Sequence, residues 1–353
     1  MISNKKHNNK KVKRNDESGI ALLMTIFVVA LSTILVLDFS AETLRYQRQC
    51  RMFQERIQAD FMLKSSIGLA ETLIELPKEP GIESDWLGDL WSVISSETSL
   101  PVEGFVGEPK IQIVDDSGKI NINSIYSETN PPFNPEQQNT IHYWRDVLTQ
   151  LFTNSGFRSE EYPEEEARTL GNIGFDAGKQ VAAIHDWIDR NNQSLSDPGF
   201  NSQGVESGLD QTFFFNRPLQ SLSELALVPG MTLDRLNSVS RFVRTANRTT
   251  SRININTAPL EVLSAIGFDT SQVEEILQQR IDLQGGYDQS TLSLLVQSGG
   301  NPKLAEVTSV RSQGFSVFIK IIMPNVTRWA KARFNVQGNG NGRRANKEYL
   351  EIL

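Results

Sequence analysis

The sequence predicts an α+β fold in which a long N-terminal helix packs on an antiparallel sheet, with a large all-helical domain inserted into the sheet region. Residues 20–76 contain no proline and a single glycine, which is typical of one uninterrupted helix. Strand-like alternation is confined to residues 110–123 and to the C-terminal region after Glu306. The block between these regions, residues 124–301, has the capping signals and apolar spacing of short helices.

The first element is an apolar run, residues 20–37, without charge, proline or glycine. As a helix this run reaches about 27 Å, close to the hydrocarbon thickness of a bilayer. Residues 1–18 carry six basic and two acidic side chains, and such an excess favours the cytoplasmic side of a membrane. We therefore predict one membrane span at residues 20–37, with the C-terminal part of the chain on the opposite side.

Gly19 lies at the polar boundary of this span, before the apolar run. A cleaved secretory signal has its small residues after the apolar core, so cleavage between Gly19 and Ile20 would instead retain the span. The alternative is an uncleaved signal anchor. Cleavage would change the net charge from -7 to -11, because residues 1–19 carry +4. A surface of that charge does not favour the phosphate backbone of nucleic acids.

Beyond the span, the helix is predicted to continue to Leu76 and to be amphipathic. Apolar residues recur at helical spacing in two stripes, and the apolar face shifts after Phe61. The first stripe is Tyr46, Cys50, Phe53 and Ile57, and the second is Leu63, Ile67, Ala70 and Ile74. A coiled-coil stalk would keep a single seam, so we expect one stripe to pack against a globular head.

Residues 77–123 and 302–353 are predicted to form that head. Residues 110–114 and 119–123 alternate around Asp116-Ser117-Gly118, which indicates a β-hairpin. Three further strands are predicted at residues 309–323, 328–336 and 347–353. We expect these strands to pair with the hairpin.

The inserted block, residues 124–301, contains predicted helices near residues 135–153 and before Ile188. Capping boxes are predicted at Ser221-Leu222-Ser223-Glu224 and at Ser271-Gln272-Val273-Glu274. An internal repeat, Ile-Asn-Ile-Asn, occurs at residues 120–123 and 253–256. The polar loop 190–216 is unusually long for a connection without a functional or metal-bound reason.

Catalytic and zinc-binding signatures are missing from the sequence. Cys50 is the single cysteine, which excludes a disulfide within the chain. The three histidines have no neighbours at zinc spacing. Residues 171–180 approach the pattern of a phosphate loop, but Gln180 stands where a Ser or Thr should bind magnesium. The sequence therefore predicts a protein that is not an enzyme.

Several motifs, taken together and in order along the chain, resemble the minor pseudopilin K family of type II secretion systems. The N-terminal motifs are the leader ending at Gly19 and Met24, the fifth residue of the mature chain, where glutamate is absent. The others are residues 118–123, Asp186-Trp187-Ile188-Asp189, residues 221–230 and residues 253–263. The family motif residues to which we assign structural roles are Asn121, Asn123, Asn254, Asn256, Thr257 and Pro259.

This resemblance implies a pseudopilin fold with a prepilin-type leader, residues 1–19, a long helix, residues 20–76, and a pilin-like head. It implies that the insertion, residues 124–301, contains SAM-like or helix-hairpin-helix-like repeats. It further implies a single-pass inner-membrane protein with a periplasmic head at the tip of the pseudopilus, where it helps to initiate assembly and supports export across the outer membrane. The implied partners are the minor pseudopilins I and J, the prepilin peptidase and the inner-membrane secretion platform.

The absent glutamate at Met24 has a physical interpretation within that family. In major pseudopilins, an intramembrane carboxylate at this position is thought to pair with the N-terminal amine of a neighbouring subunit. A subunit at the tip has no subunit above it, and an unpaired charge in the membrane is costly. Met24 suits a tip subunit, and it equally suits a side chain that simply faces lipid.

The resemblance also implies calcium in the inserted domain. The matching oxygen-rich loop follows Asp189, and calcium takes six to eight oxygen ligands. The candidate ligands are Asp186, Asp189, Asn191, Asn192 and Asp197. Helix capping by Asp189 and Asn191 is the alternative.

A tip subunit should contact its partners through outward apolar residues of the long helix, and we expect these to be Tyr46, Phe53, Ile57 and Phe61.

The alternative function is a membrane-anchored periplasmic DNA-binding protein, because residues 255–280 resemble a helix-hairpin-helix. In that motif, a Gly-apolar-Gly turn presents backbone N–H groups to phosphate. The turns at Gly230 and Gly267 lack the second glycine, and residues 253–286 contain five acids and one arginine. This charge argues against nucleic acid as a partner.

Overall fold

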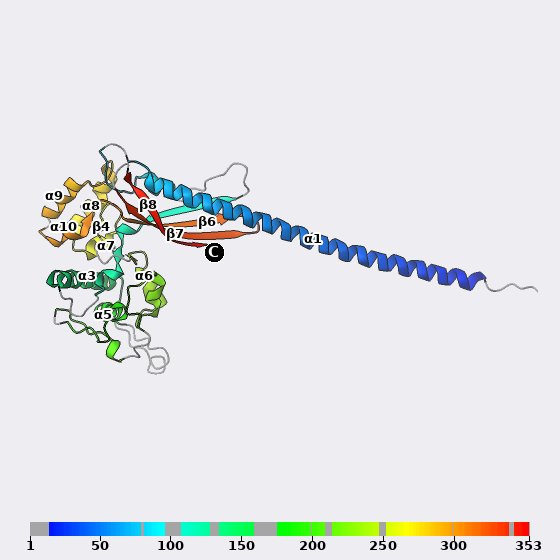
Figure 1. Ribbon diagram of the computed structural model, residues 1–353, viewed down its shortest axis with the longest axis horizontal. Helices are drawn as coiled ribbons and strands as arrows, with labels where there is room; N and C mark the ends of the chain where they lie inside the picture. The colour runs from blue at the N-terminus through cyan, green and yellow to red at the C-terminus, as the bar shows by residue number, and fades with distance from the viewer. Residues whose placement is uncertain are drawn as a thin grey trace, which may run out of the picture.

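The computed structural model describes residues 14–78, 81–95, 107–127, 134–158, 175–197, 199–208, 214–246, 252–298, 300–338 and 342–352. A single helix projects as a long rod from a head made of a sheet and a group of short helices (Figure 1). Two hydrophobic cores are present among these residues, one between the rod and the sheet and a larger one within the inserted helices.

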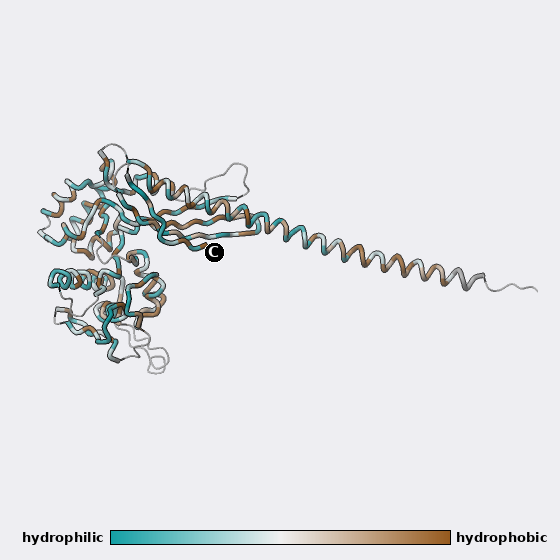
Figure 2. The backbone as a smooth tube through the Cα atoms, viewed as in Figure 1, coloured by the Kyte–Doolittle hydropathy of each residue, from teal (hydrophilic) through white to brown (hydrophobic). Residues whose placement is uncertain are grey.

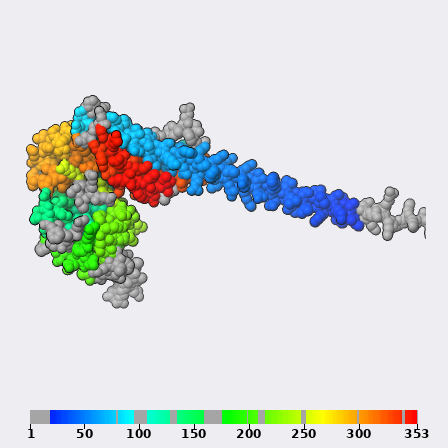
Figure 3. All heavy atoms as spheres, viewed as in Figure 1, coloured from blue at the N-terminus to red at the C-terminus, as the bar shows by residue number. Residues whose placement is uncertain are grey.

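The rod is helix α1 (Arg14–Glu75), which begins six residues before the predicted start at Ile20. Residues 19–54 are all exposed, and Figure 3 shows this part of α1 standing clear of the head. Within the described ranges, α1 is the one helix long and apolar enough to cross a membrane. Figure 2 shows its hydrophobic residues concentrated toward the N-terminal end.

Burial on α1 begins at Glu55 and continues along one face of the helix. The apolar members of this face are Ala59, Met62, Leu63, Ile67, Ala70, Leu73 and Ile74. The second predicted stripe therefore packs against the head, and the first stripe remains outside it.

Four strands form an antiparallel sheet in the order β1-β6-β7-β8. They are β1 (Glu108–Asp115), β6 (Gly314–Ile322), β7 (Thr327–Gln337) and β8 (Arg344–Ile352). Alternate residues face α1, as expected for a sheet with one covered side. The short helix α2 (Leu90–Ser95) adds Trp91, whose ring meets Phe315 edge-on at a centroid distance of 5.0 Å. The three predicted C-terminal strands are confirmed.

The predicted hairpin is wrong. β1 pairs with β6, whereas β2 (Ile120–Asn121) pairs in parallel with β3 (Val243–Arg244). Between β1 and β2, the Asp115 carboxylate accepts a hydrogen bond from the backbone of Ser117 and caps the short 3-10 turn η1 (Asp116–Gly118). This turn leads the chain out of the sheet, so Ile120 and Ile122 are buried in the larger core. The change from one core to the other therefore lies near Gly118.

The inserted part has two halves, each beginning with one copy of the Ile-Asn-Ile-Asn repeat. The first half, residues 120–246, contains β2, the 3-10 turn η2 (Ile122–Ile125), α3 (Pro135–Asn154), α5 (Ala177–Ile188), the 3-10 turns η3 (Glu206–Gly208) and η5 (Leu222–Leu227), α6 (Leu233–Val239) and β3. The second half, residues 253–309, contains β4 (Ile253–Asn254), α7 (Leu260–Ala265), α8 (Thr270–Asp282), α9 (Gln289–Ser298), α10 (Lys303–Val307) and β5 (Thr308–Ser309). In each half the repeat strand pairs in parallel with the last strand.

Two predicted capping boxes differ from the structure. The box at α8 is formed by Asp269 and Gln272 and not by Ser271 and Glu274. Ser221 caps a 3-10 turn, η5, and Glu224 accepts from the backbone N–H of Gln220 instead of that of the cap residue. At α8 the side chain of Asp269 takes the place of Ser271, and at η5 Glu224 accepts from a different backbone N–H than the predicted one.

Candidate functional sites

The first candidate site is the outward stripe of α1, defined as Tyr46, Phe53, Ile57 and Phe61. Their exposed fractions are 69%, 64%, 41% and 63%, so the head covers none of them, as expected. Large apolar side chains exposed in one row on a protein surface indicate an interaction site. Their contact with a partner stays a prediction.

Three acidic side chains of α1 fix its rotation on the sheet. Glu55 accepts two hydrogen bonds from Asn325 in the β6–β7 turn, at 2.9 Å from the backbone N and 2.8 Å from the side-chain Nδ2. Asp60 pairs with Arg328 Nε at 3.0 Å, and Glu75 accepts from the backbone N–H of Ala345 at 2.7 Å. The buried Glu55 marks the sheet side of α1, and the exposed stripe faces away from it.

The leader and Met24 give no further information on processing. Gly19, Ile20 and Met24 lie on exposed turns of α1, and a Cβ added at Gly19 would meet open space. Cleavage between Gly19 and Ile20 stays a prediction.

The two copies of the repeat bind the backbone in the same way. In the first copy, the Asn123 side chain donates to the carbonyl of Leu219 at 2.8 Å and accepts from its N–H at 2.9 Å. In the second copy, Asn256 donates to the carbonyl of Tyr287 at 2.9 Å and accepts from its N–H at 2.7 Å. We call each pair an amide clamp. All these groups are buried, so each clamp satisfies two backbone groups that water cannot reach.

The first asparagine of each copy has a different role in the two halves. Asn121 accepts from the backbone N–H of Ala246 at 3.0 Å, within the first half. Asn254 instead donates to Asp85 O, Asp115 Oδ2 and Ser312 Oγ, which belong to the sheet region. Thr257 Oγ1 adds a bond to Asp115 Oδ2 at 2.5 Å, and Pro259 precedes α7 without a side-chain capping bond. The first asparagines and Thr257 thus bind other segments of the chain, and a structural role for the whole motif stays a prediction.

The predicted calcium ligand Asp186 is occupied by backbone donors. Its Oδ1 accepts from Leu195 N at 2.8 Å, and its Oδ2 accepts from Val205 N at 2.6 Å and from Glu206 N at 3.0 Å. Burial raises the pKa of Asp186, and these hydrogen bonds act against that rise. A Cβ at Gly204 would collide with this carboxylate, so the loop needs glycine there to pass over it. Asp186 thus positions Glu206.

Asp189 and Glu206 have carboxylate oxygens without donors. Both side chains are fully buried, and within the described ranges Asp189 Oδ1 and both Glu206 oxygens have no hydrogen-bond partner. Burial and the charges of Asp186 and Glu206 raise the pKa of Asp189 to about 8. Burial and the charge of Asp186 raise the pKa of Glu206 to about 7. The sequence analysis missed Glu206, although it is one of the few acids in the polar loop.

The other predicted ligands lie around these carboxylates or away from them. Asn191 donates to Asp189 Oδ2 at 2.6 Å, and Asn192 accepts from Asn216 Nδ2 at 3.4 Å. Asn216 has a positive φ of 50° and a buried Oδ1 without a donor in the described part of the chain. Asp197 faces α3, where it pairs with Arg145 at 2.7 Å and His142 at 2.5 Å. Asp197 is therefore not placed with Asp189 and Glu206.

A buried chain of polar groups connects α3 to this cluster. Arg145 Nη2 donates to His185 Nε2 at 3.0 Å, and His185 Nδ1 donates to the carbonyl of Ile125 at 2.9 Å. Burial and the charge of Arg145 lower the pKa of His185 to about 3, so this imidazole is neutral. His185 Nε2 lies 3.5 Å from Asp189 Oδ2. The neutral histidine therefore brings no positive charge to Asp189.

The cluster fits a hard cation in its chemistry but is not a formed metal site. Unpartnered carboxylate and amide oxygens are the donors that calcium prefers. Among the described residues, however, no group of three or more His, Cys, Asp or Glu side chains is placed to hold a metal ion. The fit therefore rests on the orphaned oxygens of Asp189, Glu206 and Asn216.

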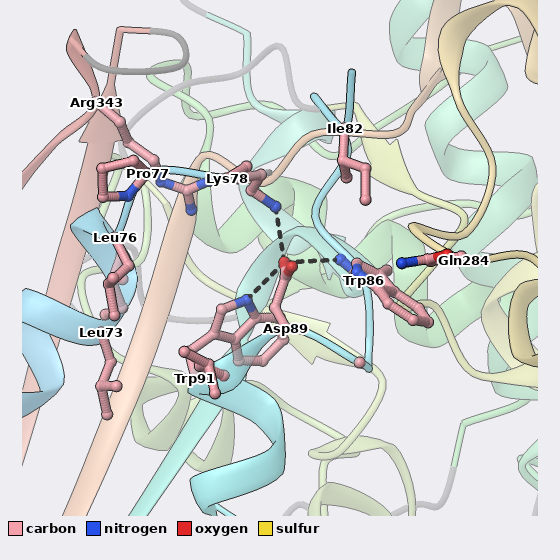
Figure 4. A pocket seen from close by; sticks show the side chains of 13 residues that line it. Leu73, Leu76, Pro77, Lys78, Ile82, Trp86, Asp89, Trp91, Gln284 and Arg343 are labelled. Atoms are coloured by element: carbon pink, nitrogen blue, oxygen red, sulfur yellow. Dashed lines mark hydrogen bonds and ion pairs between the residues drawn. The ribbon is translucent and has the colours of Figure 1, made fainter. Parts of the chain in front are cut away.

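A cavity of about 190 Å³ lies where the end of α1 meets the second half. Figure 4 shows Asp89 at its centre, accepting from Lys78 Nζ at 2.7 Å, Trp86 N at 3.2 Å and Trp91 Nε1 at 3.1 Å. Lys78 also pairs with Asp85 at 2.8 Å. Lys78 and Asp89 satisfy each other in its wall, whereas Nε and Nη2 of Arg343 are buried without a hydrogen-bond partner among the described residues.

Three comparisons with known proteins each give a match. Residues 118–247 match the family model described as type II secretion system (T2SS), protein K, and these bounds coincide with the first half of the insertion. The chain is 23% identical over 340 residues to the type II secretion system protein K of Klebsiella pneumoniae, with 92% of this chain and 94% of the relative covered.

The third match is structural. The chain resembles a chain of the crystal structure of the GspK-GspI-GspJ complex from the enterotoxigenic Escherichia coli type 2 secretion system, with a TM-score of 0.58 and 17% identity. The match covers 86% of this chain and 99% of the other. The predicted fold class is thereby confirmed. In its inserted domain, over nearly its whole length and in its fold, the chain is similar to protein K of the type II secretion system, a pseudopilin, as the sequence motifs predict.

Proposed function

We propose that this chain is a minor pseudopilin of the K type, which forms the tip of a type II secretion pseudopilus together with the minor pseudopilins I and J. The similar chain of known structure comes from a GspK-GspI-GspJ complex. The observation that carries the proposal is the exposed length of α1, residues 19–54, which extends well beyond a membrane span. Beyond the span, this part of α1 exposes large apolar side chains such as Tyr46 and Phe53, and a row of that kind favours cover by neighbouring subunits.

The role of such a subunit is structural and not catalytic. It would stand in the inner membrane by one span, carry its head in the periplasm and help to initiate the pseudopilus that exports proteins across the outer membrane. The prepilin peptidase would cut between Gly19 and Ile20, and the inner-membrane platform would receive the mature chain. Met24 carries no charge into the bilayer, which suits a subunit with no neighbour above it.

Processing tests the first step of this proposal. Gly19→Ala should block cleavage without blocking membrane insertion, and the mature wild-type chain should begin at Ile20 when its N-terminus is sequenced. Gly68→Ala is the matched control, because it is a second glycine of α1 with open space around it. A wild-type N-terminus at Met1 or after Leu37 would contradict the proposal.

Association tests the partner step. Full-length wild-type chain, co-expressed with proteins I and J of the same system and solubilised in detergent, should co-purify with both. Tyr46→Glu combined with Phe53→Glu should abolish co-purification, because charges would replace apolar contacts at the centre of the interface. Leu69→Glu changes an exposed apolar residue of α1 outside the stripe and should leave association intact.

We also propose that the first half binds calcium through Asp189 and Glu206. The support is the set of buried carboxylate oxygens without donors, a costly arrangement unless a cation compensates it. Asn216 and backbone carbonyls of the same loop would complete the oxygen ligands that calcium requires. Chelation should then lower the thermal stability of the head.

A further inference from the structure

Three arginines form a basic face on the exposed part of α1. Residues 43–54 contain Arg45, Arg48 and Arg51 and no acidic residue. All three are exposed, and none of them makes an ion pair with any other residue in the described ranges. We call these residues the arginine face.

The arginine face points in the opposite direction to the outward stripe. Residues seven apart on a helix differ by about 20° and residues four apart by about 40°, so Arg48 and Arg51 lie on the side of Glu55. Glu55 is bound to Asn325 in the β6–β7 turn, so this is the side of the sheet. Residues two apart differ by about 200°, so Arg48 points away from the side of Tyr46 and Arg51 points away from the side of Phe53. The arginine face therefore continues the sheet side of α1 toward the membrane, just beyond the β6–β7 turn.

A neighbour that covers this face must bring carboxylates. Covering a guanidinium without a partner is costly, whereas pairing it with a carboxylate gives a charge-assisted, often bidentate, hydrogen bond. We propose that a neighbouring pseudopilus subunit binds the arginine face through an acidic surface, while a different neighbour covers the outward stripe. This inference rests on the proposed function, since it is assembly that covers α1.

The height of the arginines above the membrane distinguishes a protein partner from a lipid one. For a helix that leaves the bilayer along its normal, Arg48 lies about 16 Å and Arg51 about 21 Å beyond Leu37. The field of anionic headgroups falls off within a Debye length, about 8 Å at physiological ionic strength. Two of the three arginines are therefore out of reach of lipid, and an acidic protein surface is the occupant that can meet all three.

Charge reversal of the face tests the inference. The full-length chain is co-expressed with proteins I and J, purified in detergent, and its association is measured at low and high salt. Replacing Arg45, Arg48 and Arg51 with Glu should weaken association on the order of tenfold or more, because three attractions become repulsions. Replacing the same residues with Lys keeps the charge and should restore most of the association. Wild-type association should weaken as salt rises, whereas association of the Glu variant should strengthen, because salt screens its repulsions.

Crosslinking identifies the two neighbours separately. Cys50 lies in the first apolar stripe and is exposed, so it serves as a native probe of that side. A second probe, Arg48→Cys in a Cys50→Ser background, reports on the arginine face while Arg45 and Arg51 remain. The two probes should give crosslinked products of different mass.

The outcomes separate this inference from the proposed function. If the wild-type chain fails to associate with I and J at any salt concentration, the proposed function fails and the inference with it. If the wild type associates but the Glu variant does so equally well, the proposed function stands and the inference is wrong. Vesicles with anionic lipid that bind the wild type and not the Glu variant, combined with unchanged protein association, would assign the face to lipid and overturn it too.

Discussion

The two halves of the insertion begin with the same four residues and use them differently. Asn123 and Asn256 form the same amide clamp. Asn123 binds the backbone of Leu219, 96 positions downstream, and Asn256 binds the backbone of Tyr287, 31 positions downstream. Asn121 then bonds within its own half, whereas Asn254 bonds to Asp115 and Ser312 of the sheet region. The comparison shows that the second asparagine has the same role in both halves, while the role of the first depends on what packs against that half.

The halves also differ in their buried charge. The first half contains the orphaned carboxylates of Asp189 and Glu206. In the described part of the second half, Asn254 and Asn256 are the buried polar side chains of the repeat, and both are hydrogen-bonded. The first half is therefore the one whose stability should depend on a cation.

Removing an amide clamp should have the largest effect, and it should be similar in the two halves. Asn123→Ala or Asn256→Ala leaves a buried N–H and a buried C=O without partners, at about 1–3 kcal/mol for each group. We expect each variant to lower the free energy of unfolding by about 3 kcal/mol. Urea unfolding of the full chain in detergent measures this loss, and Asn237→Ala, at an exposed position, is the control. Equal stability of wild type and clamp variants would contradict the structural role of the motif.

Calcium removal should affect the first half alone. A ligand at 100 times its Kd stabilises the folded state by about 2.7 kcal/mol. Chelator should therefore lower the melting temperature and raise hydrogen exchange in α3 and α5, with α8 and α9 unchanged. Asp189→Asn combined with Glu206→Gln should remove this response, and Glu274→Gln, an exposed acid of the second half, should keep it. An identical melting curve with and without chelator removes calcium from the account.

Substituting the first asparagine should separate the halves most clearly. Asn254→Ala removes donors to Asp85, Asp115 and Ser312, and we expect a loss of about 2 kcal/mol with faster exchange where the insertion meets the sheet. Asn121→Ala should raise exchange only around Ala246. Hydrogen exchange followed by mass spectrometry measures both variants. If Asn121→Ala raised hydrogen exchange where the insertion meets the sheet as much as Asn254→Ala does, the two positions would be equivalent.

The helix caps should give the smallest effect. Asp176 caps α5 in the first half and Asp269 caps α8 in the second, through bonds of 2.7 Å to Lys179 N and 2.8 Å to Gln272 N. Substituting either by Ala should cost about 1 kcal/mol. The loss at Asp269 should be the larger, since Gln272 returns a bond to its backbone N–H. Ser271→Ala is the control. If it lowered the free energy of unfolding as much as Asp269→Ala does, the cap predicted from the sequence would be the correct one.

The long helix and the C-terminal strands could be predicted because their signals are local and periodic. Leu63, Ile67, Ala70 and Ile74 repeat at helical spacing, and that spacing alone indicates a face that packs. Strand β7 alternates between buried and more exposed positions along its 11 residues, and β6 does so in its second half. Burial of one face of each element follows directly from such patterns.

The predicted β-hairpin is wrong because the residues of its predicted turn can also form a 3-10 turn. Asp116-Ser117-Gly118 suits a hairpin, but Asp115 caps a 3-10 turn there, and Gly118 lies too close to Thr257 for a side chain. The true partner of Ile120, Val243, lies more than a hundred residues away in a strand of two residues. A strand that short has no periodicity to detect.

Only part of the candidate cation cluster could be predicted from the sequence, for a similar reason. Asp186 and Asp189 lie three residues apart in one family motif, so both could be predicted from the sequence. Glu206 joins them because the loop folds back and hydrogen-bonds Asp186 through its own backbone N–H. Composition indicates that such a loop contains acids, but only the path of the chain shows which one turns inward.

The three acidic contacts of α1 also have a mechanical consequence. Glu55, Asp60 and Glu75 are attached to the β6–β7 turn, to β7 and to β8 over twenty residues, or about 30 Å of helix. A pull along the helix axis, as when a span is drawn out of a bilayer, loads all these bonds together in shear and not one after another. The rod and the sheet should therefore move as a single lever, and force applied at the membrane end would reach the insertion through β1 and β6, the strands that precede and follow it in the chain.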